Sequence, residues 1–439
     1  MDRRPGTPRL LRELNDRAAL ELLLTGGPMT RAQLGERTGL SKVTASQLLS
    51  RLEDRGLVEV TGEQAGGRGP NAALYGVVPA SAYVAGLHVE RDEVSAGVAD
   101  VTGKVVTEIS VDPNGTGDPV ELVRGAVGRV CGAAGIAPDA LRAFVIGTPG
   151  VLDPRTGDLR LAVNLPAWHE GVHDALRADL GRPVTIENDV NLAAMAERAA
   201  GAATGTDDFV LVWIGVGLGL ATMLGGRLHR GVGGAAGEIG YLPVPGVPLP
   251  QDITHPATGA FQSLVGAQAV LPLAAGYGFE AGTAAGAVRA AIDVLGAGGQ
   301  RRLAGEQFLA ELASRVATGV AAICVVLDPG LVVLGGEVGL AGGAPLAGLV
   351  AAEVGRISPA KPAVVPTGIS SSPVLRGAIL AAVDQARAEL LASVASLPAR
   401  AGRQAWRMAA GAGSIGLSAH ADAAAALGDP HADSPCQRD

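Results

Sequence analysis

The sequence predicts a mixed α/β protein, in which a small helical segment with a β-hairpin precedes a larger body built from two related halves. Three observations predict this class. Apolar residues near the N-terminus recur at helical spacing. From about residue 81 onward, segments typical of strands alternate with segments typical of helices. The strand–turn–strand pattern of residues 83–110 returns in residues 209–230, which indicates a duplicated fold with a ligand-binding cleft between two lobes.

Length and composition indicate several folded domains. A chain of 439 residues is too long for one ordinary core, and a hydrophobic content of 48% with 18% charged residues is typical of folded globules. We expect a head over residues 1–78 and a body over residues 79–398. Residues 399–439 are rich in Ala, Gly, His and Asp with weak periodicity, which predicts a largely disordered tail.

The cysteine pattern and the apolar runs predict a cytoplasmic protein without a membrane partner. The three cysteines are odd in number and far apart, so no disulfide framework is expected. The N-terminus is charged and lacks the apolar core of a signal peptide. No uninterrupted apolar run reaches the ~20 residues that a membrane helix needs.

Charge is distributed unevenly between the head and the rest of the chain. Residues 1–75 contain 11 basic and 9 acidic side chains, whereas the remainder contains 24 basic and 34 acidic ones. A mildly basic head on an acidic body favours a protein whose head alone contacts nucleic acid.

The sequence of the head predicts three helices and a hairpin. In the first helix the apolar residues at helical spacing are Leu10, Leu11, Leu14, Ala18, Leu22 and Leu23, and the segment Gly26-Gly27-Pro28 ends it. Thr30 and Gln33 form a capping box at the start of the second helix, which ends at Gly39. Ser41 caps the third helix, and Gly56 follows its end. The apolar stripe of the third helix is Ala45, Leu48, Leu49 and Leu52. Residues 57–61 and 73–77 read as paired strands around a loop.

This order of elements predicts a winged helix-turn-helix, with the third helix in the major groove of DNA and the loop on or in the minor groove. The outward polar and basic side chains suit base edges and phosphates. The predicted DNA-binding residues are Arg31, Ser41, Lys42, Thr44, Ser46, Gln47, Arg51 and Arg68. The alternative is an ordinary helical cap or dimerisation bundle with a solvated polar face. The wing and the basic bias favour DNA binding.

Five motifs occur in order along the body. They are GTPG at 147–150, NLPAW at 164–168, ENDVN at 187–191, RGVGGAAGEIG at 230–240 and VLGGE at 333–337. Together they resemble the ROK family of repressors, uncharacterised frames and sugar kinases, over about residues 10–390. The resemblance implies a two-lobed, actin-like ATPase fold of the ribonuclease H-like type. Regulators of that family carry an N-terminal winged helix, as is expected here.

The resemblance implies a sugar-binding site. A sugar kinase needs a carboxylate that takes the proton of the sugar hydroxyl, and Asp189 matches that catalytic base if the chain is a kinase. Gln262 stands where a second sugar-binding carboxylate is usual. The implied sugar-binding residues are Gly150, Asn164, Asn188, Asp189, Glu238 and Gln262. Two alternatives stay open: Asn188 and Asp189 cap the helix that follows them, and Glu238 is a solvated turn residue.

The nucleotide-binding side departs from the family pattern. Residues 86–92 lack the glycine pair and threonine of the first phosphate loop, and Glu90 adds a negative charge there. The second loop, Gly215-Val216-Gly217, lacks its hydroxyl. The vestigial nucleotide-binding residues are Gly215, Gly217, Gly335 and Gly336, and glycines also persist for backbone reasons. We therefore expect no bound ATP or Mg²⁺ and no catalytic residue.

The zinc site of the family also departs from its pattern. Tyr241 replaces the usual histidine, the following run has no cysteine, and His255 alone cannot hold a structural zinc. No metal and no cofactor are expected.

The sequence thus favours a DNA-binding transcriptional regulator, specifically a repressor of carbohydrate-related genes. Its expected partners are a double-stranded DNA operator and a sugar or sugar derivative, and two heads for two half-sites predict a homodimer or homotetramer. The alternatives are an active ATP-dependent sugar kinase and a DNA-binding scaffold that needs no ligand.

Overall fold

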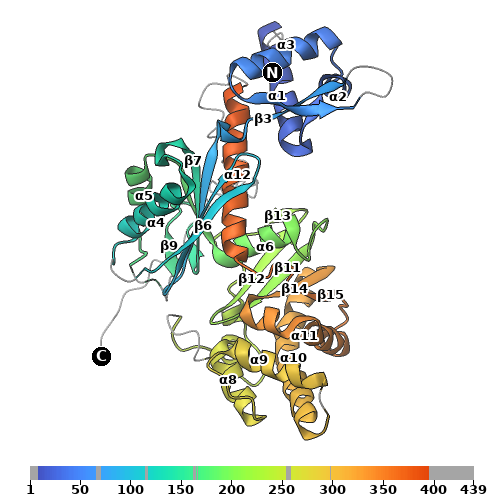
Figure 1. Ribbon diagram of the computed structural model, residues 1–439. Helices are drawn as coiled ribbons and strands as arrows, with labels where there is room; N and C mark the ends of the chain where they lie inside the picture. The colour runs from blue at the N-terminus through green and yellow to red at the C-terminus, as the bar shows by residue number, and fades with distance from the viewer. Residues whose placement is uncertain are drawn as a thin grey trace, which may run out of the picture. The chain divides into compact units, whose positions relative to one another are not determined.

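The structure is a computed structural model that describes residues 8–65, 71–113, 117–161, 165, 167–253, 259–296 and 298–394. The chain divides into two compact units (Figure 1). The head unit comprises the chain up to Val77 together with the chain from Ala388, and the body unit is Val78–Arg387. Residues 399–439, for which a tail is predicted, lie outside the described residues.

The head unit has the predicted three helices and hairpin. Its elements are α1 (Pro8–Gly26), β1 (Met29–Thr30), α2 (Arg31–Thr38), α3 (Lys42–Asp54), β2 (Val58–Gln64) and β3 (Ala72–Val77). The strands form one sheet in the order β1-β3-β2, with antiparallel pairing. The predicted capping box of Thr30 and Gln33 is present, and Gly39 ends α2 in the left-handed conformation. Gly56 follows α3 with φ of 65°, a conformation that glycine adopts without strain.

Most of the apolar residues that fall at helical spacing in α1 lie outside its buried face. The buried residues of α1 are Asp16, Ala19, Leu20 and Leu23. Leu11 and Leu14, two of the apolar residues at helical spacing, are 55% and 49% exposed. The helix is apolar on several sides, so residue spacing alone does not identify the face that packs against the head. Leu20, which is fully buried, marks that face.

The first lobe of the body contains a sheet in the order β10-β7-β4-β5-β6. Its elements are β4 (Tyr83–Val89), β5 (Val94–Asp100), β6 (Val105–Val111), α4 (Pro119–Ala134), β7 (Leu141–Thr148), β8 (Val151–Leu152), β9 (Leu159–Leu161), α5 (Val172–Leu180), β10 (Val184–Asn188) and α6 (Asp189–Ala200). Strands β4, β5 and β6 form an antiparallel meander, whereas β7 pairs with β4 in parallel and β10 pairs with β7 in parallel.

The second lobe repeats this plan with the order β13-β12-β11-β14-β15. Its strands are β11 (Phe209–Ile214), β12 (Leu218–Leu224), β13 (Arg227–Leu228), β14 (Leu331–Gly335) and β15 (Ala363–Pro366). The helices are α7 (Gln262–Val265), α8 (Ala267–Gly276), α9 (Ala284–Asp293), α10 (Gln300–Leu327) and α11 (Gly336–Ile357). The last described helix, α12 (Pro373–Val394), returns to the first lobe, where Ile379 lies against Gly86 of β4 and Gly97 of β5. Again three antiparallel strands are extended by two parallel ones, so the predicted duplication is confirmed.

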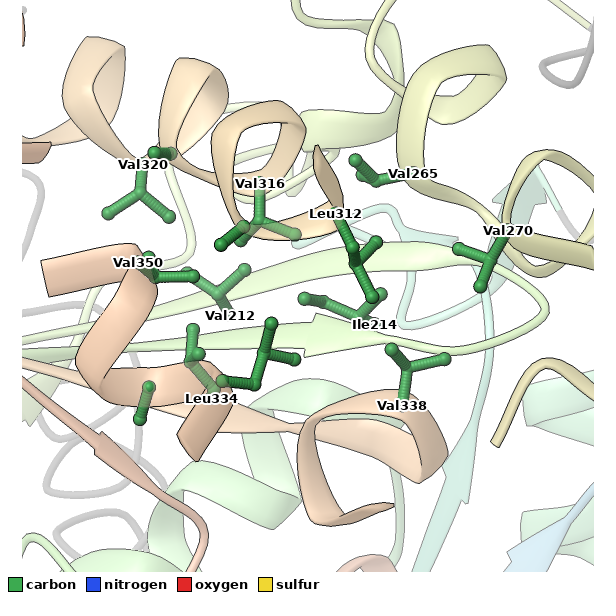
Figure 2. Packing of buried hydrophobic residues seen from close by; sticks show 14 of the residues in the cluster. Val212, Ile214, Val265, Val270, Leu312, Val316, Val320, Leu334, Val338 and Val350 are labelled. Carbon is green, nitrogen blue, oxygen red and sulfur yellow. The ribbon is translucent and has the colours of Figure 1, made fainter. Parts of the chain in front are cut away.

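The core of the second lobe lies between its sheet and the helices α10 and α11. Figure 2 shows Leu312, Val316 and Val320 of α10 above the strand residues Val212 and Ile214. All five are at most 1% exposed. Burial of such side chains stabilises the lobe by about 1.5–3 kcal/mol for each large aliphatic residue.

Helices α10 and α11 are, by length and composition, apolar enough to cross a membrane. Neither helix is an uninterrupted apolar run, since α10 contains Glu311 and Arg315 and α11 contains Glu353. Core helices of folded proteins pass the same test, and both helices bury residues in the second lobe, among them Phe308 and Val350. The absence of a membrane partner therefore stays a prediction.

Candidate functional site

The outward face of α3 is the first candidate surface. Lys42 and Gln47 are exposed, whereas Thr44 and Ser46 are half-buried. The Ser41 hydroxyl accepts a hydrogen bond from the backbone amide of Thr44 at 3.2 Å and also contacts the Thr44 hydroxyl at 2.9 Å. Ser41 is thus the predicted helix cap, and its oxygen is already used by the first turn.

Arg51, one of the predicted DNA-binding residues, has a different role. Its guanidinium donates to both carboxylate oxygens of Asp16 on α1, at 3.0 Å and 2.5 Å. This paired geometry raises the pKa of Arg51 above its ordinary value, chiefly through the hydrogen bond from its side chain. The Asp16 side chain is only 8% exposed, so the contact joins two helices of the head. We therefore remove Arg51 from the predicted DNA contacts.

Two further predicted DNA contacts lie outside α3. Arg31, at the start of α2, is exposed and donates to the hydroxyl of Tyr75 at 3.1 Å. Its guanidinium has further N–H groups with which to contact a phosphate. Arg68 lies outside the described residues.

The sequence reasoning missed two residues of the same face. Val43, Gln47 and Ser50 follow the i, i+4, i+7 spacing of one side of a helix. All three are exposed, and the buried residues Ala45, Leu48 and Leu52 occupy the opposite side. Val43 and Ser50 therefore lie at the centre of the outward face. The spacing of the apolar stripe predicts that positions 43 and 50 face outward. Val43 is apolar, however, whereas the predicted DNA contacts are polar or basic.

The second candidate site lies where β10 ends and α6 begins. Asn188 caps α6, because its side-chain oxygen accepts from the amide of Asn191 at 3.1 Å. Its side-chain nitrogen donates to the carbonyl of Gly150 at 3.2 Å. Asp189 is the first residue of α6 and accepts from the amide of Val190 at 2.8 Å. The capping role left open from the sequence is confirmed for Asn188, and the same junction brings Gly150, Asn188 and Asp189 together.

Glu187 connects this junction to the second lobe. One of its carboxylate oxygens accepts from the backbone of Asn188 at 3.0 Å and from the side chain of Asn191 at 2.9 Å. The other accepts from the Arg230 guanidinium, with both contacts at 2.7 Å. The motifs at 187–191 and 230–240 are thus joined directly, by two residues that sequence reasoning did not select.

Four titratable groups interact around Asp189. Desolvation raises the pKa of Asp189, an effect opposed by His88 and reinforced by Glu90. Desolvation, followed by the charge of Asp189, raises the pKa of Glu238 to about 7. Burial lowers the pKa of His88, whose Nε2 is buried without a hydrogen-bond partner among the described residues. Sequence reasoning took His88 as structural, and no local motif distinguishes it.

Gln262, a predicted sugar contact, has a different role. Its side-chain oxygen accepts from the amide of Leu218 and its side-chain nitrogen donates to the carbonyl of Val216, both at 2.9 Å. The residue is 8% exposed, so it fixes the backbone of the second glycine loop from within the lobe. We remove Gln262 from the candidate sugar-binding residues. Asn164 lies outside the described residues.

The carboxyl group of Glu337 lies beside Gly215, in the loop Gly215-Val216-Gly217. A Cβ atom built on Gly215 would lie 3.2 Å from a carboxylate oxygen of Glu337, the second residue of α11. Desolvation raises the pKa of Glu337, and the charge of Glu90 raises it further. Gly336 has φ of 73°, and a Cβ there would meet the carbonyl oxygen of Ile214 at 2.5 Å, so this glycine has a backbone reason to persist. The carboxyl groups of Glu90 and Glu337 thus lie close enough to interact, beside Gly215.

Tyr241 stands where the family pattern has a histidine of a zinc site. Its hydroxyl donates to the carbonyl of Ile253 at 2.5 Å. Among the described residues there is no group of three or more His, Cys, Asp or Glu side chains that could hold a metal ion. His255 lies outside the described residues.

The two units define a class of protein with a winged-helix head and a sugar-kinase-like body. Residues 84–384 match the model of the ROK family, and residues 13–69 match the model of the MarR family. The chain belongs to the ROK family.

Two curated relatives have names that describe regulators. The xylose repressor of Bacillus subtilis is 26% identical over 240 residues, which cover 53% of this chain and 61% of that protein. The DNA-binding transcriptional dual regulator NagC of Escherichia coli is 25% identical over 241 residues, which cover 54% of this chain and 59% of NagC. The chain thus spans about three fifths of the length of these relatives.

Solved structures of the family include both a kinase and a regulator. A ROK hexokinase from Thermus thermophilus is 28% identical, covers 70% of this chain and 99% of its own, and superposes with a TM-score of 0.56. A ROK family transcriptional regulator, a homologue of the E. coli MLC protein, covers 88% of this chain and 99% of its own with a TM-score of 0.65. At 17% identity the latter shows the fold alone.

Proposed function

We propose that this chain is a DNA-binding transcriptional regulator of carbohydrate-related genes, acting as a repressor whose DNA affinity changes when a sugar or sugar derivative binds its body. The observation that carries the proposal is the outward face of α3 in a MarR-type head, where Lys42 in the first turn is exposed and Gln47 is exposed opposite the buried stripe. The names of the relatives, a xylose repressor and a DNA-binding regulator, favour the same function.

The proposed ligand site is the junction of β10 and α6. Gly150, Asn188, Asp189 and Glu238 are its described residues, and Asn164 joins them from sequence alone. Carboxylates and amides suit the hydroxyl groups of a sugar ring because they accept and donate hydrogen bonds. A ligand that prefers one conformational state tenfold shifts the equilibrium by only about 1.4 kcal/mol.

A phosphotransfer activity is the second candidate function. It is favoured by Asp189 at the start of α6 and by the 28% identity with a ROK hexokinase. We propose that the activity is absent, since the carboxyl groups of Glu90 and Glu337 lie beside Gly215, where a phosphate-binding loop would need open space. A phosphate there would meet two carboxyl groups instead of the N–H groups and cations that phosphoryl transfer requires. For the same reason we propose no bound ATP or Mg²⁺, and no zinc because the ligand set around Tyr241 is lost.

We further propose a cytoplasmic homodimer or homotetramer that binds a palindromic operator. Two heads on two half-sites match the symmetry of such an operator. The acidic body and mildly basic head favour contact of the DNA with the head alone.

Two measurements test this function. The full chain is used to select duplexes from a random library, and enrichment of one palindromic sequence is expected; a library that stays unenriched would contradict DNA-sequence recognition. ADP release is then measured with xylose, glucose and N-acetylglucosamine, using Asp189→Asn as the control. Turnover that this substitution abolishes would establish the kinase instead.

A further inference from the structure

The outward face of α3 has an apolar centre. Val43, in the first turn of the helix, is 67% exposed, although valine is a large aliphatic residue. It shares one helix face with Gln47 and Ser50, and the residues of the buried stripe lie on the opposite side. Packing within the head therefore gives no reason for an aliphatic side chain at this position.

Exposure alone does not make Val43 a contact residue, because single exposed aliphatic residues are common on folded proteins. The charges around it supply the second observation. Lys42 precedes it in the same turn, and the acidic residues of α3, Glu53 and Asp54, occur only at the other end of the helix. The end of α3 that contains Val43 is therefore neutral to basic, which complements the negative charge of DNA.

We propose that Val43 packs against the 5-methyl group of a thymine in the major groove, and thereby specifies that base pair of the operator half-site. The proposal rests on the proposed DNA-binding function. The N-terminal residues of a recognition helix are those that reach base edges. Thymine presents the only methyl group among the four bases in that groove, and apolar side chains recognise it by contact.

Gln47 lies one turn after Val43 on the same face and supplies a hydrogen-bonding partner for a neighbouring base pair. The apolar contact of Val43 and the side-chain amide of Gln47 would together specify two adjacent base pairs. Ser50, a further turn along, is short and leaves room for the backbone of the DNA. This assignment makes Val43 a determinant of specificity, whereas Lys42 contributes affinity for any sequence.

The test removes the methyl group from the DNA and the side chain from the protein in turn. The full chain is titrated against its selected operator and against duplexes in which each thymine of one half-site is replaced by deoxyuridine, which lacks only the 5-methyl group. At one position the replacement should weaken binding about fourfold, the fold-change that corresponds to about 0.8 kcal/mol for a buried methyl group. For Val43→Ala the same replacement should change the affinity less than twofold.

Two controls separate the outcomes. Val325→Ala makes the same substitution at a valine that is 64% exposed in the body unit, and it should keep the full sensitivity to deoxyuridine. Alanine has a higher helix propensity than valine, so Val43→Ala should not unfold the helix, and its melting temperature confirms this. If no operator is enriched, the proposed function fails. If the wild-type chain binds its operator and no deoxyuridine weakens it, or if Val43→Ala retains the penalty, the thymine contact is overturned.

Discussion

Glu187 and Arg230 form an ion pair that joins the two lobes of the body. Glu187 is the last residue but one of β10 in the first lobe, and Arg230 lies two residues after the end of β13 in the second lobe. Both contacts of the guanidinium to the carboxylate oxygen are 2.7 Å long. The remaining oxygen of Glu187 holds the start of α6, where Asp189 lies. A substitution of either residue therefore removes a contact that helps to position the candidate sugar site.

Removing one partner of this pair should destabilise the body. Glu187→Ala leaves Arg230 without its carboxylate and the amide groups of Asn188 and Asn191 without an acceptor, so we expect a loss of about 2–4 kcal/mol in the free energy of unfolding. Arg230→Ala should cost less, about 1–2 kcal/mol, because 44% of the Arg230 side chain is exposed. Urea unfolding of both single variants and the double variant measures the coupling. Strict additivity would contradict a direct interaction.

Glu197 should be more important for stability than its position on α6 indicates. It is 1% exposed, and its carboxylate accepts from the backbone amides of Ala202, Gly368 and Ile369 at 2.7–3.2 Å and from the Thr367 hydroxyl. Glu197→Ala leaves these donors unsatisfied, and we expect a loss of about 3 kcal/mol in unfolding free energy. Glu311→Ala, which removes a surface pair with Arg315, should change it by less than about 0.5 kcal/mol. Equal effects of the two variants would disprove the assignment.

Glu238 should make the stability of the body depend on pH. Its pKa is raised from 4.5 to about 7, because burial and the charge of Asp189 disfavour the ionised form. The neutral carboxyl therefore contributes stability that is fully present below pH 4.5 and lost as the pH rises through about 7. Glu238→Gln should be more stable than the wild type at about pH 8, by up to about 3 kcal/mol, and should lose this advantage below pH 4.5. Denaturant unfolding at both pH values checks the sign, and an advantage that grew on acidification would contradict it.

Arg51 and Lys42 should separate stability from DNA affinity. Arg51→Ala breaks the pair with Asp16 and should lower the unfolding free energy of the head by about 1–3 kcal/mol. Lys42→Ala should change it by less than about 0.5 kcal/mol but weaken binding to any duplex and reduce the slope of log affinity against log salt by about 1. Thermal unfolding and titrations at several salt concentrations distinguish the two residues. A reduced salt slope for a fully folded Arg51→Ala head would restore Arg51 to the DNA contacts.

Local chemistry made much of the fold predictable. Thr30 with Gln33, Ser41 and Gly56 mark helix ends because capping depends on residues within one turn of one another. The duplicated sheets were predictable because both copies keep the same order of strands and turns. The face of α1 was not, since its leucines surround much of the helix.

The contacts that the sequence did not reveal join residues far apart in the chain. Arg51 bonds Asp16 across 35 positions, Arg230 bonds Glu187 across 43, and Gln262 bonds Val216 across 46. No periodicity in the sequence predicts such pairs. The sequence alone therefore does not distinguish a basic or polar side chain that is available to a ligand from one that bonds another residue of the chain. The motifs predicted Gly150, Asn188 and Asp189, which the structure brings together, but not Glu187, which bonds the start of α6 beside them.

The central claim is that sugar binding in the body alters DNA binding by the head. The most direct test is the affinity of the full chain for its selected operator, measured by fluorescence anisotropy with and without xylose, glucose or N-acetylglucosamine. We predict that one sugar changes the dissociation constant at least about tenfold, equivalent to about 1.4 kcal/mol, and that Asp189→Asn removes this response while operator binding remains. Unchanged affinity with every sugar, in a chain that binds its operator specifically, would contradict the account and favour a DNA-binding protein that needs no ligand.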